Sequence, residues 1–172
     1  MGFLVRENLS CVADIKNPST LVVGVCQMLS MDVRRDRALR IRQAVEREIE
    51  NGSRYFCHFK KDLMGLCAIC SAALAEDLKK AGDDVKICKG WFRGRHGHCW
   101  VESRTDALDI TATQFWGVHK PIMIINKSKR LYRDLFQFGF EAKSLDAFGE
   151  WPEEQRPTEE RIERLLQLSG LI

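Results

Sequence analysis

Residues 63–82 read LMGLCAICSAALAEDLKKAG, and this stretch decides the fold that we expect for the chain. Apolar residues recur in it at steps of three and four, which is the spacing of one buried face on an α-helix. The members of this face are Leu66, Ile69, Cys70, Ala73, Leu74, Leu78 and Ala81. Gly82 is a typical C-cap, so the pattern predicts a core helix that begins near Cys67 and ends at Gly82.

Cys67 falls in the first turn of this helix, where backbone N–H groups have no partner within the helix. These groups and the positive end of the helix dipole favour a thiolate over a thiol, which makes Cys67 a candidate nucleophile. Free cysteine is also among the most buried residue types, and a small core side chain is the alternative interpretation.

Length and composition predict one globular domain over residues 1–172, with 45% hydrophobic and 30% charged residues. The net charge of +3 gives no reason to expect a nucleic-acid or membrane partner. Seven cysteines without a leader of basic and then apolar residues favour reduced thiols in a cytoplasmic protein, or in an effector delivered into another cell. No apolar run approaches the ~20 residues of a membrane helix.

Elsewhere the pattern predicts further helices and a set of strands, hence an α+β fold. Three further helices are expected. The first starts at residues 17–20, the second covers residues 32–50, and the third runs from a cap at Thr158 to Gly170. The expected strands are residues 85–92, 98–102, 107–111 and 121–125. We expect these strands to form an antiparallel sheet packed against the helix that carries Cys67 at its N-terminus. The five arginines between positions 34 and 42 are expected to face solvent.

A histidine and an aspartate lie on neighbouring strands of this sheet. We place the turn between them at Ser103 and Arg104. In that register His98 lies opposite Asp109 on the same face, with Cβ atoms about 4.5–5.5 Å apart. The carboxyl group then accepts a hydrogen bond from one ring nitrogen, and the other nitrogen takes a proton from Cys67, as in a Cys-His-Asp triad. Taken singly, each residue also fits a structural role.

Three motifs carry a family resemblance: GLCAICS at residues 65–71, HCWVE at 98–102 and LDITATQF at 108–115. Their order and spacing resemble the transglutaminase-like branch of the papain-like cysteine hydrolases, in particular its short bacterial and phage members, over residues 63–117. The resemblance implies a papain-like or transglutaminase-like fold, with Cys67 as nucleophile, His98 as base and Asp109 as the group that orients it. Neither a cofactor nor a metal is expected.

We therefore expect a cysteine-dependent enzyme that acts on amide or acyl bonds of a protein or peptide through a thioacyl intermediate. A protease, an amidase or deamidase, and a transglutaminase-type acyl transferase share this intermediate, and the triad does not distinguish them. Trp100 and Gln114 match motif positions that we expect to support the site. The backbone N–H of Cys67 is one expected donor to the oxyanion.

Two alternatives come from other classes of protein. In the first, Cys67 and Cys70 form the C-x-x-C pair of a thiol–disulfide redox protein. In the second, a binding module holds zinc, with ligands drawn from Cys57, Cys67, Cys70, His96, His98 and Cys99. A weaker variant is a nucleic-acid patch formed by Lys86, Lys89, Trp91, Phe92, Arg93 and Arg95.

Overall fold

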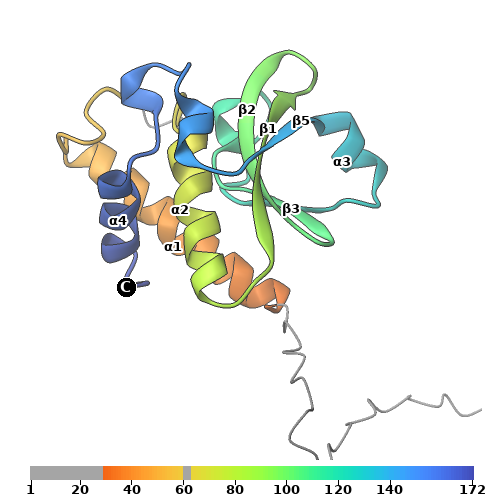
Figure 1. Cartoon of the computed structure of the whole chain (residues 1–172), viewed down its shortest axis with the longest axis horizontal. Helices are drawn as coiled ribbons and strands as arrows, with labels where there is room; N and C mark the ends of the chain where they lie inside the picture. The colour runs from red at the N-terminus through yellow and green to blue at the C-terminus, as the bar shows by residue number, and fades with distance from the viewer. Residues whose placement is uncertain (1–28, 60–62) are drawn as a thin grey trace, which may run out of the picture.

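Helix α2 (Cys67–Lys80) lies at the centre of the structure, a computed structural model that describes residues 29–59 and 63–172. In Figure 1 the sheet lies to the right of α2 and helix α4 (Glu159–Leu168) to its left, while helix α1 (Met31–Glu50) crosses behind α2; all of them contact α2. The chain therefore forms an α+β fold in which one helix is covered from both sides, as the sequence predicts in outline.

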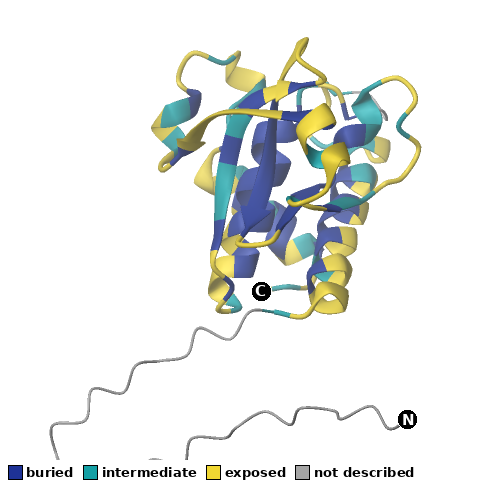
Figure 2. Cartoon of the chain, turned by 90° about the vertical axis from the view of Figure 1, so that its right-hand side faces the viewer, coloured by how far each residue is buried: buried dark blue, intermediate teal, exposed yellow. Residues whose placement is uncertain are grey.

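Helix α2 is buried on more sides than a single apolar stripe predicts. Only Glu76, Lys79 and Lys80 of this helix are exposed, and the burial continues into the central strands (Figure 2). Small residues make this possible, because alanines on several sides of α2 let neighbouring elements approach closely. Gly82 follows the helix with a φ of 88°, the left-handed conformation that a glycine C-cap adopts.

The sheet is antiparallel and has the strand order β4-β3-β2-β1-β5. Its strands are β1 (Val85–Phe92), β2 (His96–Ser103), β3 (Asp106–Asp109), β4 (Met123–Asn126) and β5 (Phe136–Ala142). The first four confirm predicted strands, whereas β5 was not predicted. The sequence of β5, FQFGFEA, contains a central glycine, and its five middle residues are all exposed, so it lacks the alternation that marks a half-buried strand.

The predicted register between β2 and β3 is wrong by two residues. Val101 pairs with Leu108, so the turn is centred on Arg104 and Thr105. The hydroxyl of Ser103 holds this longer turn by accepting hydrogen bonds from backbone N–H groups within it, at 3.0 and 3.3 Å. A shift of two keeps every side chain on its predicted face, because strand side chains alternate with period two.

Helices α1 and α4 agree with the sequence pattern at their ends, whereas the short helix α3 (Arg130–Leu135) was not predicted. Helix α1 covers the predicted span, and Thr158 caps α4 by accepting a hydrogen bond from the N–H of Arg161 at 3.3 Å. Helix α3 lies between β4 and β5. The helix expected from residues 17–20 lies outside the described residues. None of the helices in the described part of the chain has the length and apolar character needed to span a bilayer.

The prediction that the five arginines between positions 34 and 42 face solvent is wrong for Arg34 and Arg42, which are buried. Two nitrogens of Arg34 donate to the carboxylate of Asp83, at 2.6 and 2.8 Å, and a third lies 3.4 Å from Asp106. These bonds tie α1 to the segment between α2 and β1 and to the start of β3. An arginine can be buried when its charge is paired in this bidentate manner.

Replacing Arg34 tests this buried ion pair. We expect Arg34→Ala to lower the free energy of unfolding by about 3 kcal/mol, because Asp83 is left buried without its partner. Arg35→Ala is the matched control, since Arg35 is the next residue of the same helix and is exposed; its effect should stay within about 0.5 kcal/mol. Urea unfolding followed by circular dichroism measures both, and equal effects would contradict the assignment.

Candidate active site

Cys67 is the first residue of α2, as predicted, and its side chain is almost fully buried, with 2% exposure. The chain reaches it through a tight approach in which Leu63 and Gly65 both have positive φ, 62° and 86°. The residue before Cys67, Leu66, provides no side-chain cap for the helix. The first-turn N–H groups therefore lack the hydrogen bond that a capping side chain supplies, which favours an anion at this end of the helix.

His98 and Asp109 are joined directly. Nε2 of His98 lies 2.6 Å from Oδ2 of Asp109, and both side chains are buried. The other carboxyl oxygen accepts hydrogen bonds from the backbone N–H and the hydroxyl of Thr111, at 2.8 and 3.0 Å. In the observed register Asp109 is the diagonal neighbour of His98 rather than its opposite, yet the two side chains still meet, because they share a face.

Arg42 of α1 supports the segment that follows Asp109. Its Nη1 donates to the carbonyl of Ile110 at 2.7 Å and to the hydroxyl of Thr113 at 2.8 Å. The backbone after β3 is thereby fixed from the helical layer, which holds the carboxyl group of Asp109 in place. The arginine that the sequence pattern assigned to solvent is thus a supporting residue of the site.

Aromatic rings surround the imidazole of His98. Phe92 and Phe115 meet it edge to face, with ring centroids at 5.7 and 4.9 Å, and Trp100 stacks with it at 6.2 Å. Trp100 is fixed in turn, because its indole N–H donates to Glu102 at 2.9 Å. This enclosure fixes the plane of the imidazole and keeps water away from it; the supporting role predicted for Trp100 stays a prediction.

Cys67 interacts with two residues of β2. Cys67 and Cys99 pack in one buried cluster, and both Cys99 and His98 act on the pKa of the Cys67 thiol. Since Asp109 occupies Nε2, Nδ1 is the ring nitrogen left for Cys67. The hydrogen bond from Cys99, followed by the hydrogen bond and the positive charge of His98, lowers the pKa of Cys67 below its ordinary value, although burial opposes this.

The pKa of His98 shifts in the opposite direction from that of Cys67. Burial disfavours its charged form, but the charge and hydrogen bond of Asp109 outweigh it, and contact with Cys67 adds to their effect. The pKa of His98 is raised to about 10. Between the lowered pKa of Cys67 and this value the pair exists as a thiolate and an imidazolium, the form needed for nucleophilic attack.

Cys70 lies in a different environment, one turn further along α2. It is fully buried among the apolar residues of the main core, and this burial raises the pKa of its thiol. Cys70 therefore remains protonated and packs as a small apolar side chain. This asymmetry disfavours a redox pair of Cys67 and Cys70, in which both sulfurs exchange electrons.

A cleft of about 660 Å³ opens beside Cys67. Its walls include Gln114 and Phe115 after β3, Trp116, and Trp151 and Gln155 from the segment before α4. The amide nitrogen of Gln114 lies 3.4 Å from Nδ1 of His98 and 3.1 Å from the carbonyl of Thr111. Gln114 thus lies on the Nδ1 side of the imidazole, and its supporting role stays a prediction.

Sequence reasoning missed three contributors. From the sequence, Cys99 is predicted only as a zinc ligand, and no role in the site is predicted for Trp116 or Gln155. The only sequence signal for Cys99 was its place next to His98, and it became informative once the structure placed α2 over β2. In the described ranges, 29–59 and 63–172, no three or more His, Cys, Asp or Glu side chains are placed to hold a metal ion, so the zinc alternative is not supported.

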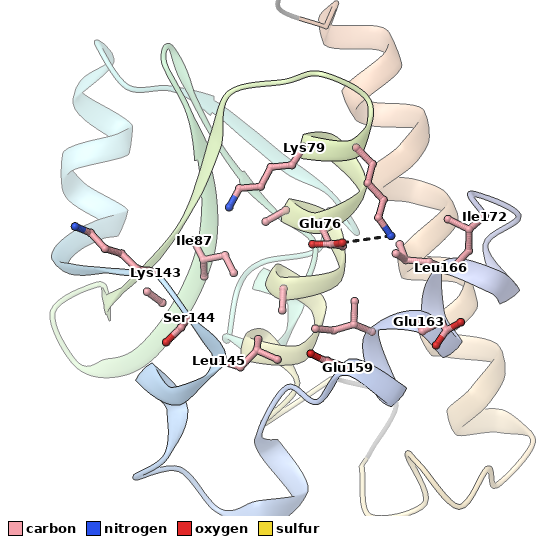
Figure 3. Close-up of a pocket in the computed structure, with 15 residues that line it drawn as sticks. Glu76, Lys79, Ile87, Lys143, Ser144, Leu145, Glu159, Glu163, Leu166 and Ile172 are labelled. Atoms are coloured by element: carbon pink, nitrogen blue, oxygen red, sulfur yellow. Dashed lines mark ion pairs between the residues drawn. The ribbon is translucent and has the colours of Figure 1, made fainter.

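A second hollow, of about 460 Å³, lies between α2, α4 and the end of β5 (Figure 3). Its walls are apolar residues such as Ile87 and Leu166 together with charged side chains, including the Glu76–Lys80 ion pair at 3.2 Å. No cysteine or histidine lines it. The cleft at the other end of α2 is the one that Cys67 lines, and His98 and Asp109 are buried beneath Cys67's end of the helix.

Comparisons with protein-family models, curated proteins and solved structures find no match for the chain. The resemblance of residues 63–117 to the transglutaminase-like branch therefore stays a prediction. Support for a function comes instead from the contacts among Cys67, His98, Asp109 and Cys99.

Replacing Cys99 tests the thiol contact. Cys99→Ala removes a donor to the Cys67 thiolate, so the pKa of Cys67 should rise by roughly one unit. Alkylation of Cys67 by iodoacetamide, measured by mass spectrometry across pH, should show its midpoint moving to higher pH. Cys88→Ala is the control, because Cys88 is fully buried in the cluster with Trp100, away from Cys67. A midpoint that does not move in Cys99→Ala would contradict the contact.

Proposed function

We propose that the protein is a cysteine-dependent enzyme, papain-like or transglutaminase-like in fold, that forms a thioacyl intermediate on Cys67. The observation that carries the proposal is the buried pair of His98 and Asp109 at 2.6 Å, beside a buried Cys67 whose pKa is lowered by Cys99 and His98. Nucleophile, base and orienting carboxyl come from three different elements, α2, β2 and β3. Such convergence in one cleft is what acyl-transfer chemistry requires.

The proposed reaction begins with attack of the Cys67 thiolate on the acyl carbon of an amide. The backbone N–H of Cys67, at the uncapped start of α2, donates to the oxyanion that develops. The imidazolium of His98 gives its Nδ1 proton to the leaving amine as the C–N bond breaks, which leaves a thioester. Water or a second amine then attacks the thioester, His98 accepts its proton, and the thiolate is released.

The class of substrate that we propose is a protein or peptide amide. The cleft is open and about 660 Å³ in volume, and both aromatic and polar residues line it, which suits an extended peptide. Hydrolysis, deamidation and transfer differ only in which amine leaves and which nucleophile enters, so all three fit this site. We propose no nucleic-acid or membrane partner.

The compartment that we propose follows from the chemistry. A thiolate nucleophile needs a reducing environment, and the cytoplasm supplies one, either of the producing cell or of a cell into which the protein is delivered. The neighbouring thiol of Cys99 makes the need stronger, because two sulfurs in contact are able to form a disulfide under oxidation.

Labelling of the nucleophile is the first test of the proposal. A peptidyl vinyl sulfone should modify Cys67 in the wild-type protein, and Cys67→Ala should abolish this with little change in melting temperature. Cys70→Ala should keep the labelling while losing about 1 kcal/mol of stability from lost packing. Intact-protein mass spectrometry and peptide mapping report the modified residue. Labelling that survives in Cys67→Ala but not in Cys70→Ala would overturn the assignment.

The role of Asp109 gives a second test. Asp109→Asn keeps an acceptor for Nε2 of His98 but removes the negative charge, so the pKa of His98 should fall from about 10 toward its ordinary value. The rate of Cys67 labelling at neutral pH should fall by about 10². Imidazole titration by NMR and labelling kinetics measure the two effects. Asp134→Asn, at an exposed position of α3, is the control; an unchanged Asp109→Asn would exclude the pairing from the mechanism.

A further inference from the structure

The turn between β1 and β2 has an unusual residue at its tip. The N–H of Arg95 donates to the carbonyl of Phe92 at 3.2 Å, and the central residues Arg93 and Gly94 have φ values of 51° and 65°. Positive φ at both positions defines a type I′ turn, whose first central residue is usually Asn, Asp or Gly. An arginine is strained there, and such strain occurs most often at functional sites.

Arg93 connects this turn to the rim of the active-site cleft. Its Nη1 donates to the backbone carbonyl of Trp116 at 3.1 Å, and its guanidinium lies 5.4 Å from the ring centre of Phe92. The indole of Trp116 itself is 94% exposed, the largest exposed fraction among the large apolar residues that the structure describes. The backbone of the rim is thus fixed while the indole is left open to a ligand.

Arg95 stands where two hollows meet. The active-site cleft and a smaller hollow of about 410 Å³ share Arg95, His96, Phe115 and Trp116 as lining residues. No acidic residue lines the smaller hollow, and the acidic residue in the cleft, Glu150, does not line it. Within the described residues, the guanidinium of Arg95 has neither a hydrogen bond nor an ion pair. This end of the cleft therefore carries positive charge that no residue described by the structure neutralises.

We propose that Arg95, with Trp116, forms a subsite that binds a carboxylate of the substrate, so that the preferred substrates are peptides with an acidic residue close to the reacting amide. The proposal rests on the proposed function of Cys67. Guanidinium binds carboxylate through two parallel hydrogen bonds, and the exposed indole packs on the adjoining peptide or side-chain carbons. Arg93 positions the subsite by holding the backbone of Trp116.

The test uses pairs of peptidyl vinyl sulfones that differ only in Glu against Gln, with the pair scanned through the positions that flank the reactive group. We expect the Glu probe to label Cys67 about fivefold faster than its Gln partner at one of these positions, as an ion pair at an exposed site allows. This ratio should shrink as salt is added. In Arg95→Gln the Glu-to-Gln ratio should fall to about one.

Arg104→Gln is the matched control, because Arg104 is an exposed arginine in the turn at the opposite end of β2. It makes the same change in net charge and should keep the Glu-to-Gln ratio of the wild-type protein. A wild-type ratio of about one at every position would overturn the subsite and leave the proposed function standing. A ratio that persists in Arg95→Gln would also overturn it. Failure of every probe to label Cys67 would instead overturn the proposed function, and the subsite with it.

Discussion

The structure depends on how the N-terminus of α2 is buried against β2. A helix start that lies in the interior leaves N–H groups that need an acceptor, and Leu66 offers no side chain for this. A thiolate at Cys67 supplies negative charge at this point, and Cys99 and His98 of the neighbouring strand favour it by lowering the pKa of the thiol. The same packing that completes the core thus creates the reactive form of the cysteine.

This arrangement places several charges in the interior, and the remaining parts of the fold compensate for them. In the ion-pair state Cys67 and Asp109 are negative and His98 is positive, which leaves an excess of negative charge. Arg42 of α1 reaches the same region, where it holds Ile110 and acts electrostatically on Cys70, although it also pairs with the partly exposed Glu46. Helix α1 is therefore more than a cover for α2, since its arginine contributes a buried positive charge beside the site.

Much of the fold could be predicted because its elements obey simple periods. Helices α1, α2 and α4 and strands β1 to β4 follow from spacing and capping, and the position of Cys67 follows from its place at a helix start; the short helix α3 was not predicted. Strand β5 could not be found, since it is an exposed edge strand whose order comes from pairing with β1. The burial of Arg34 could not be found either, because its acidic partners are 49 and 72 residues away in sequence.

The prediction of the His98–Asp109 pair shows why a site can be predicted when its register is not. An error of one residue would have put Asp109 on the opposite face of the sheet, but an error of two changes only the distance along the strand. The two side chains still meet, because a histidine and a carboxylate on diagonally placed residues of neighbouring strands are within reach of each other. What the pattern could not supply is the anchoring of the second carboxyl oxygen by Thr111. That contact directs Oδ2 toward the imidazole, and with it the other ring nitrogen toward Cys67.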